Sequence, residues 1–569
     1  MLSIFLSKHL ENNLIAQHPQ CELKRKQRLA LFFFCDGSDT QKSSETGILR
    51  GLLFQAIRQR PSLLGHLIRI CEDQSKDLFQ DWSFECLWTV LRAFLLDAAI
   101  PGTLGLKEDE LEDPQNPSAC IIVDGLDECE APSIRRLVHK LSRLEEDDEL
   151  RARMKVIVIS RERPNLRYAF VGRYLQLNLE DPRNAQAVFA DVQRYIVQQV
   201  DSIASADKKD YPEELRNSVA SFLSQNTQAK FLWVFLVMTE LEATSRIEAW
   251  EQLSRLPSTI DALYEWMIMK IPHQWRETLS KVLLWVTLAY RPLSVAELAT
   301  ALDERRLGLT DSEIIRGCVS HCGQILRTAA DGTIHPVHHS AREYLYERLE
   351  SAPSFFKDCV ELNPFNLKEG HKFIASFCIK NLVIPNWPGI RDSGKRSKKN
   401  EKTRDRARFS SGTSTALSDY AREFWARHIR NAEDLMLEIA DSHSELFGEN
   451  SSTRGLLAHE FSKGLLTMDT PILHFAAYHG FTPLVQRLLK RGWRNKLRAR
   501  RLMRQKDSLG RTALHLATHY HDNVPIVELL LGRGADVSCK DHAGATALDH
   551  ATKYGTPEMV SFLVAQGQQ

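Results

Sequence analysis

The stretch ACIIVDGLDECE, at 119–130, decides how the first part of this sequence is interpreted. Within it, the apolar run 120–123 predicts a strand that is buried on both faces. Three acids follow the run almost at once, at Asp124, Asp127 and Glu128. Carboxylates are costly to bury unless they are paired or bind a metal, and α/β folds bind ligands at the carboxyl ends of their strands. The stretch therefore predicts half of a site for a cation and the phosphates that it accompanies.

Two further buried strands flank this one along the chain. The run LALFFFC at 29–35 precedes it, and KVIVIS at 155–160 follows it. Apolar residues at helical spacing fill the intervals at 48–57 and 132–144, and they predict another amphipathic helix at 2–14. Strands that alternate with helices favour a parallel sheet joined by right-handed crossovers.

The middle of the chain has a mainly helical pattern. The apolar runs 231–241 and 281–290 are shorter than the ~20 residues that cross a bilayer, so we interpret them as buried helices and expect no membrane segment. Ser294 and Glu297 have the spacing of a capping box at a helix start. The segment 333–349 begins like a strand and continues like a helix.

The last hundred residues repeat themselves. Thr512 and Thr546 lie 34 positions apart, close to the ~33-residue period of ankyrin arrays. An earlier unit begins at Thr470, and its longer spacing to Thr512 comes from a basic insert at 493–506. Each unit buries its apolar face only by stacking on its neighbours, so about three units are expected to form one solenoid. Thr512 and His515 are expected to form hydrogen bonds within the turn and between units.

Shifts in composition divide the chain into six predicted segments. A charged stretch that is poor in apolar residues, 389–412, is interpreted as a disordered linker. The predicted segments are an α/β core at 1–180, a helical domain at 181–268, a winged-helix and helical region at 269–388, the basic linker at 389–412, a helical connector at 413–465 and the ankyrin repeats at 466–569.

Length and composition exclude several broad classes. At 569 residues the chain is too long for one core, given roughly 100 to 200 residues per domain. Its 74 basic and 73 acidic residues leave a net charge of +1, so the overall charge favours neither nucleic acid nor an anionic membrane. Eleven irregularly spaced cysteines favour reduced thiols and a cytoplasmic location. A nuclear location is the alternative if the basic linker is a nuclear localisation signal.

Taken in order, these motifs resemble those of fungal NACHT-type proteins, which are STAND NTPases, and of their nephrocystin-like relatives. CIIVDGLDE resembles the Walker B strand, VIVISRERP the sensor strand after it, and RPLSVAELATAL with HPVHHSAREYL the winged-helix region. The resemblance implies an α/β P-loop-NTPase-like core that is truncated at its N-terminus. Helical and winged-helix domains and a C-terminal α-solenoid of ankyrin repeats would follow. It also implies ATP or ADP with Mg²⁺ as ligands, a homo-oligomer formed through the core, and a part in nonself recognition or cell death.

The same resemblance assigns roles to five residues. Asp124 would hold Mg²⁺, and Asp127 and Glu128 would polarise the attacking water. Arg161 would contact the terminal phosphate, and His338 of the winged helix would contact the β-phosphate. A structural alternative stands beside each role. The acids could cap the next helix, Arg161 could be a surface residue before a turn, and His338 could be structural.

The other half of such a site is G-x-x-x-x-G-K-[ST], whose backbone N–H groups wrap the phosphates. The sequence contains no match; the nearest, GIRDSGKR at 389–396, has arginine in place of the hydroxyl residue and follows the acidic strand. In the family the loop leads into the helix that here is predicted at 2–14. We therefore expect either a truncated copy of a longer protein or a degenerate member with impaired nucleotide binding.

Other groupings are weaker candidates. The CVSHC stretch at 318–322 has no matching second pair, so we expect no zinc site. Cys129 has no recognisable histidine partner and is expected to be structural. The basic segments 394–408 and 490–506 could contact nucleic acid, but the second offers only Trp493 for base stacking, which favours a solvated loop.

The sequence thus predicts a regulatory scaffold that binds a protein partner through its repeats. One alternative is an ATP-hydrolysing switch whose phosphate loop lies upstream or comes from a partner subunit. The other is a plain ankyrin adaptor. Whether the chain is an enzyme depends on the phosphate loop, and as given it is not expected to hydrolyse ATP.

Overall fold

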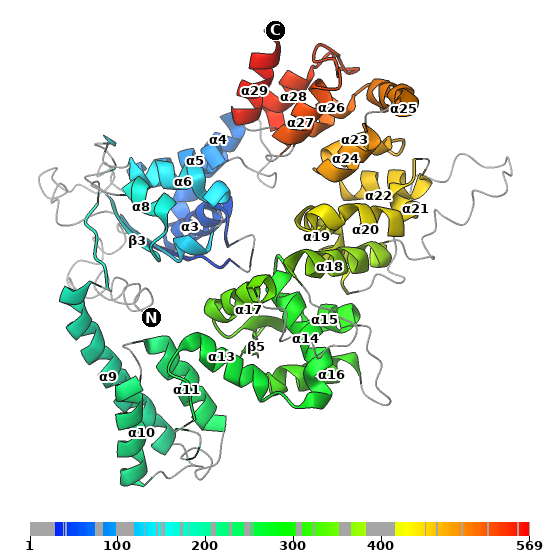
Figure 1. Ribbon diagram of the computed structural model, residues 1–569. Helices are drawn as coiled ribbons and strands as arrows, with labels where there is room; N and C mark the ends of the chain where they lie inside the picture. Colours follow the sequence, from blue (N-terminus) through cyan, green and yellow to red (C-terminus); the bar gives the residue numbers. More distant parts are fainter. Residues whose placement is uncertain are drawn as a thin grey trace, which may run out of the picture. The chain divides into compact units, whose positions relative to one another are not determined.

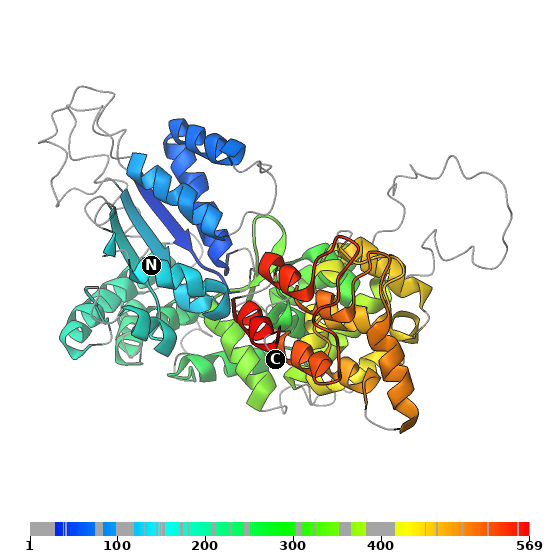
Figure 2. The same ribbon diagram turned by 90° about the horizontal axis from the view of Figure 1, so that it is seen from above.

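The structure is a computed structural model. It describes residues 29–37, 39, 42–73, 84–97, 119–129, 131–143, 146–147, 150, 154–170, 174–179, 181–205, 212–226, 230–243, 251, 253, 255–302, 310–322, 325–351, 366–382, 416–449, 451–462, 465–490, 493–519, 523–554 and 557–567. The chain divides into two compact units, 1–258 with 290–292 and 259–289 with 293–569. Figures 1 and 2 show their elements from two directions. The helix predicted at 2–14 and the linker predicted at 389–412 lie outside the described residues.

A three-stranded parallel sheet in the order β1-β2-β3 forms the centre of the first unit. The strands are β1 (Leu29–Phe34), β2 (Ala119–Asp124) and β3 (Met154–Ile159). The register pairs Phe34 with Asp124 and Asp124 with Ile159, so the three strands end at one edge. β2 is central and buried along its apolar run, as the sequence predicts for a strand covered on both faces.

The first unit also contains helices, of which α3 packs on the sheet. Helix α3 packs against β1 and α5, and Ser44 caps it by accepting a hydrogen bond from Gly47 N at 3.2 Å. Gln55 protects the outer edge of β1, because its side chain exchanges hydrogen bonds with both backbone groups of Phe32. The helices are α3 (Glu45–Gln59), η1 (Pro61–Leu63), α4 (Leu64–Asp73), α5 (Phe84–Asp97), η3 (Leu126–Glu128), α6 (Ala131–Ser142), α8 (Pro164–Phe170), α9 (Pro182–Ser205), α10 (Glu213–Asn226) and α11 (Phe231–Ala243).

The second unit begins with a helical region that carries a small antiparallel sheet in the order β4-β6-β5. The predicted capping box is confirmed, because Glu297 N donates to Ser294 Oγ at 3.2 Å and Ser294 N donates to Glu297 Oε2 at 2.8 Å. The elements are α13 (Ile260–Met269), α14 (His273–Leu288), β4 (Leu293–Ser294), α15 (Val295–Leu302), α16 (Asp311–His321), β5 (Leu326–Thr328), β6 (Thr333–Pro336) and α17 (His339–Ser351). The apolar runs that the sequence assigns to buried helices lie in α11 and α14.

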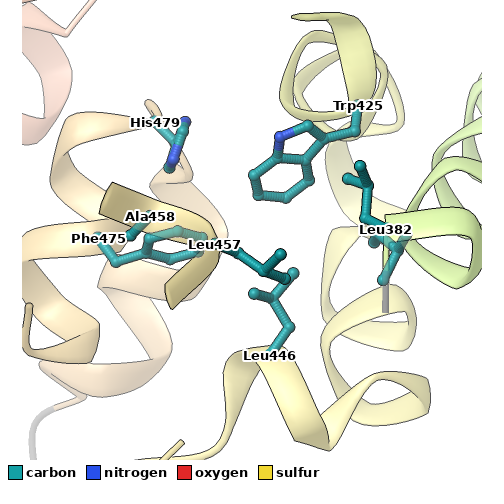
Figure 3. A pocket seen from close by; sticks show the side chains of 8 residues that line it. Leu382, Trp425, Leu446, Leu457, Ala458, Phe475 and His479 are labelled. Atoms are coloured by element: carbon teal, nitrogen blue, oxygen red, sulfur yellow. The ribbon is translucent and has the colours of Figure 1, made fainter. Parts of the chain in front are cut away.

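Connector helices follow, and α18 packs closely on α19. They are α18 (Leu367–Leu382), α19 (Ser418–Asn431), η6 (Glu433–Leu435), α20 (Met436–Ser442), α21 (Ser444–Phe447) and α22 (Ser452–Phe461). Where they meet the first repeat, Trp425 stacks with Phe475 at 5.9 Å and meets the ring of His479 at 5.1 Å. Figure 3 shows these rings around an apolar pocket that is too narrow to admit a water molecule. Burial lowers the pKa of His479 to about 3, so its imidazole is neutral in this contact.

Three helix pairs form the C-terminal array, as the repeat period predicts. They are α23 (Ile472–Tyr478) with α24 (Thr482–Leu488), α26 (Ala513–Ala517) with α27 (Val524–Leu531), and α28 (Ala547–Tyr554) with α29 (Pro557–Gly567). The basic insert between the first two pairs is helix α25 (Trp493–Arg504), so the prediction of a loop there is wrong. Buried Leu502 attaches this helix to the unit. The prediction of a loop fails because six of the twelve residues are lysine or arginine, and Leu497 on the same helix is exposed.

Among the described residues, we find no helix both long enough and apolar enough to span a bilayer.

Candidate functional site

Asp124 ends the central strand at the edge where all three strands stop. Its carbonyl accepts a hydrogen bond from Cys35 N at 2.8 Å, and Gly125 N donates to Ile159 O at 2.9 Å. Gly125 has φ +73°, which lets the chain turn away from the sheet directly after the carboxylate. Within the described part of the chain, no group donates a hydrogen bond to the half-buried Asp124 carboxylate.

Asp127 is held by the end of the neighbouring strand. Its carboxylate accepts hydrogen bonds from Arg161 N at 3.0 Å and Arg161 Nε at 2.7 Å, and the Ser160 hydroxyl donates to it at 3.2 Å. The Asp127 side chain is 4% exposed, whereas that of Arg161 is 49% exposed. Burial by itself would raise the pKa of Asp127, but the two hydrogen bonds and the charge of Arg161 bring it below its usual value. Asp127 is thus a fixed anion that positions Arg161.

Glu128 lies against the end of β1. Its Oε2 accepts a hydrogen bond from Gly37 N at 3.2 Å. A Cβ atom at Gly37 would lie 2.6 Å from Glu128 O, so only glycine allows this approach. Burial, supported by the negative charges of Asp36 and Asp127, raises the pKa of Glu128 to about 7. Two adjacent acids therefore have opposite shifts, and only Glu128 can exchange a proton near neutral pH.

The Cys35 thiol beside these acids is a poor nucleophile. A hydrogen bond with the Cys129 thiol, together with burial, raises the pKa of Cys35 far above its usual range. Both cysteines are buried. This geometry agrees with the structural role that the sequence predicts for Cys129.

His338 lies in the second unit, between β6 and α17. Ser340 N donates to His338 Nδ1 at 3.2 Å, so the neutral imidazole carries its proton on Nε2. The Ser340 hydroxyl lies 2.9 Å from the same nitrogen and 2.8 Å from the hydroxyl of Tyr264.

The edge of the first unit thus gathers four of the five predicted site residues, and the fifth is in the other unit. Their roles toward metal and phosphate stay predictions. The arrangement supplies one carboxylate that accepts no hydrogen bond from the described residues, one arginine fixed by an acid, and one carboxyl that titrates near neutral pH. Sequence reasoning missed Gly37 and Ser160; a glycine shortly after a buried strand was the available signal for the first.

The repeats are joined by imidazoles. Thr512 N donates to His515 Nδ1 at 3.2 Å, and His515 Nε2 donates to Ala545 O at 3.2 Å, which links the second repeat to the third. His474 Nε2 donates to Arg511 O at 2.9 Å and links the first repeat to the second. The predicted bonding of Thr512 and His515 within and between units is confirmed.

A buried ion pair in the second repeat was not predicted. Arg511 donates through Nε to Asp507 Oδ2 at 2.8 Å, and its Nη2 donates to Leu465 O at 2.7 Å. The side chains of Asp507 and Arg511 are 0% and 5% exposed. Beside them, the exposed Leu509 and His542 are joined by a hydrogen bond from His542 N to Leu509 O at 3.0 Å. A rigid turn thus displays two side chains to solvent.

Comparison with known families agrees with this order of parts. Residues 1–161 match the family described as nephrocystin 3, N-terminal. Residues 264–355 match the winged-helix domain of GPI inositol-deacylase. The family of ankyrin repeats in three copies matches at 454–541 and at 473–569.

One curated relative adds a biological context. The chain is 28% identical over 332 residues to the vegetative incompatibility protein HET-E-1 of Podospora anserina. The match covers 57% of this chain and 23% of the relative, so the chain spans less than a quarter of that protein. Together, these matches support a fungal protein of the NACHT–ankyrin type.

Proposed function

We propose that this chain, with the nephrocystin-like region, winged helix and ankyrin repeats of a fungal NACHT-type protein, is a signalling scaffold that binds a protein partner. The observation that carries the proposal is the array of repeats. Imidazole hydrogen bonds join its three units, and its turns display side chains such as Leu509, which is 48% exposed. Stacked repeats of this kind provide extended binding surfaces.

The setting follows from the relative whose name refers to vegetative incompatibility. We assign the chain to a comparable response in fungi, with nonself recognition or cell death as its outcome and the cytoplasm as its location. The NTPase-like core would act as a regulatory and oligomerising part. In the chain as given it would bind nucleotide weakly or not at all, because the sequence holds no G-x-x-x-x-G-K-[ST] to wrap the phosphates.

An active ATP-hydrolysing switch is the second candidate, and one observation favours it. Glu128 has a pKa of about 7 because it is buried beside other acids, and a general base works best when its pKa lies near the working pH. Asp124 would then ligate Mg²⁺, Arg161 would contact the γ-phosphate and His338 the β-phosphate. A phosphate loop from a longer chain or from a partner subunit would complete this site.

Quantitative affinity capture from fungal extract tests the scaffold function with the full chain as bait. We expect a reproducible partner whose recovery falls at least about tenfold with the double substitution Leu509→Glu and His542→Glu. Leu177→Glu is the matched control, because Leu177 is 72% exposed and lies in the first unit. Equal recovery with wild type, double variant and control would reject the array as the binding surface.

A thermal-shift titration separates the two candidates. The scaffold proposal expects no change in Tm with MgATP or MgADP. A rise that Asp124→Asn abolishes would support the nucleotide switch, since binding to the folded state alone stabilises it.

A further inference from the structure

A polar pocket lies between the connector and the basic insert helix α25. It has a volume of about 270 Å³, near the lower end for small-ligand sites. Its walls come from α22, from the chain just before α23 and from one side of α25, and Met468 at its margin is 60% exposed. Neither the nucleotide-site residues nor the exposed repeat turns belong to this pocket.

One polar group of the pocket has unused hydrogen-bonding capacity, and a second brings a positive charge to the wall. The Oε1 atom of Gln505 is buried and has no hydrogen-bond partner in the described part of the chain. A buried carbonyl oxygen without a donor destabilises the folded chain, so a ligand group that donates to it is favoured. The buried Arg454 donates four hydrogen bonds, all to backbone carbonyls, which fixes this wall of the pocket. Among the described residues, no carboxylate forms a hydrogen bond with its guanidinium.

Helix α25 carries a dense positive charge. Its sequence, WRNKLRARRLMR, has six lysines and arginines and no acid. Arg500 and Arg504 are exposed and share one face at a spacing of four residues; among the described residues neither has an acidic partner. Arg501 lines the pocket, and Arg498, three residues earlier, lies on the same side of the helix.

A carboxylate of this chain already occupies part of that face. Glu449 accepts a hydrogen bond from Arg498 Nε at 2.5 Å and lies 3.8 Å from Arg501 Nη2. The Arg501 side chain is nevertheless 69% exposed, so Glu449 alone does not neutralise the positive charge of the helix. The contact with Glu449 shows that Arg498 and Arg501 pair with a protein carboxylate in the folded state.

From these observations we propose that α25 and the pocket beside it bind an acidic segment of a protein partner. Carboxylates of the partner pair with Arg500, Arg501 and Arg504. A neighbouring hydroxyl or amide group of the partner enters the pocket and donates to Gln505 Oε1. The proposal rests on the proposed scaffold function and specifies the chemistry of its partner.

Protein is favoured over nucleic acid by the composition of the surface. Stacking platforms for bases need aromatic rings, and Trp493 is the one aromatic residue in the α25 sequence. The Gln505 carbonyl oxygen can accept a hydrogen bond from a neutral donor that fits the pocket. Serine, threonine, asparagine or glutamine next to an acid would supply such a donor. A phosphate backbone offers acceptors there instead of donors.

Fluorescence anisotropy with the full chain tests the proposal. The probe is a labelled twelve-residue peptide of alternating Glu and Ser, and the same length of Gln and Ser is the uncharged control. We expect the acidic peptide to bind at least about tenfold more tightly, with an affinity that falls as salt is added. Replacing Ser by Ala should weaken binding severalfold, and this difference should vanish in Gln505→Leu.

Charge variants locate the site. Arg500→Glu with Arg504→Glu should weaken binding of the acidic peptide at least about tenfold. The control, Arg69→Glu with Arg327→Glu, changes net charge equally at exposed positions that have no acidic partner among the described residues. Glu449→Gln should strengthen binding severalfold, because it releases Arg498 and Arg501. A gain of function cannot arise from misfolding, so this variant keeps the test decisive if the arginine variant unfolds.

Three outcomes overturn the proposal: equal binding of the acidic and uncharged peptides, equal loss in the control pair, or unchanged binding in Glu449→Gln. Tighter binding of a single-stranded oligonucleotide or of phosphatidylserine vesicles than of the peptide also overturns it. If partner capture still depends on Leu509 and His542, the scaffold function survives and only the assignment to α25 fails.

Discussion

Burial shifts pKa values upward at the sheet edge of the first unit and downward in the second unit. At the sheet edge, burial beside other acids raises the pKa of Glu128 to about 7. In the connector and repeats, burial lowers the pKa of His371, His474 and His519 to about 4. Burial favours the neutral form in both places, and the neutral form is protonated for a carboxyl but deprotonated for an imidazole. Lowering the pH from about 7 to about 4.5 should therefore stabilise the sheet edge through Glu128 while it destabilises the second unit.

The largest expected effect is acid lability of the second unit. Below an unfolded-state pKa of about 6.5, the unfolded chain binds more protons than the folded one, so stability falls as pH falls. Each buried histidine contributes up to about 1.4 kcal/mol per pH unit. The histidines concerned are His371, His428, His474, His479 and His519. We expect a loss of several kcal/mol between pH 6.5 and 5.

Hydrogen exchange read by mass spectrometry, corrected for the intrinsic pH dependence, follows each unit separately. Protection of α18, α19 and α23 should drop at pH 5, while protection of β1 and β2 should hold or rise. His428 is the key contact, because it is fully buried and its ring joins Tyr420 at 2.7 Å and His371 at 2.8 Å. Parallel loss of protection in both units would show that the comparison is wrong.

Asp507→Ala should produce the next largest effect. It leaves the guanidinium of Arg511 buried without its carboxylate, and removing one partner of a buried ion pair costs about 3 to 5 kcal/mol. Chemical denaturation followed by exchange in α26 measures the loss. Replacing both residues, Asp507→Ala with Arg511→Met, should recover part of the stability. A loss below about 1 kcal/mol in the single variant would mean that water reaches the pair.

Asp127→Asn sharpens the comparison at the sheet edge. Asp127 is as buried as Asp507, but its partner Arg161 is 49% exposed and can return to water. We therefore expect a smaller loss, about 1 to 3 kcal/mol, from the weakened hydrogen bonds. Because the pKa of Asp127 is lowered by Arg161, its stabilisation is present above about pH 4 and is lost as pH falls further. The measurement is unfolding of the first unit at pH 7 and pH 3.

Some features of both units could be predicted from the sequence. Strand positions, the capping box at Ser294 and the bonding of Thr512 with His515 follow from short-range patterns with a known period. Gathering of Asp124, Asp127, Glu128 and Arg161 at one edge follows from the parallel order of the strands. In each case a local rule fixes the geometry.

The remaining features depend on contacts that no period encodes. The stacking of Trp425 on Phe475 joins elements from different motifs, and it appears only once the helices are packed. The opposite pKa shifts of Asp127 and Glu128 depend on which group donates a hydrogen bond to each carboxylate, and the sequence of two adjacent acids does not reveal this. The sequence predicts a loop for helix α25 because half of its residues are charged; of its side chains that the structure describes, Leu502 is the one that is buried.

Glu128→Gln has the smallest expected effect and the most specific one. The raised pKa means that the folded state holds a proton that the unfolded state has released between about pH 4.5 and 7, so wild-type stability falls with rising pH across this window. The full difference would amount to roughly 3 kcal/mol; because Glu128 is partly exposed, we expect about 1 to 2 kcal/mol.

The glutamine keeps the acceptor for Gly37 N but carries no charge, so the variant should be more stable than wild type by about 1 to 2 kcal/mol at pH 8 and equal to it at pH 4.5. Denaturant unfolding of the first unit at both values measures this. Glu162→Gln is a suitable control, because that acid is exposed at the same edge. A constant difference at both pH values would mean that Glu128 stays charged in the folded state. The acid edge would then lack the group that titrates near neutral pH, and the case for a catalytic base there would fall with it.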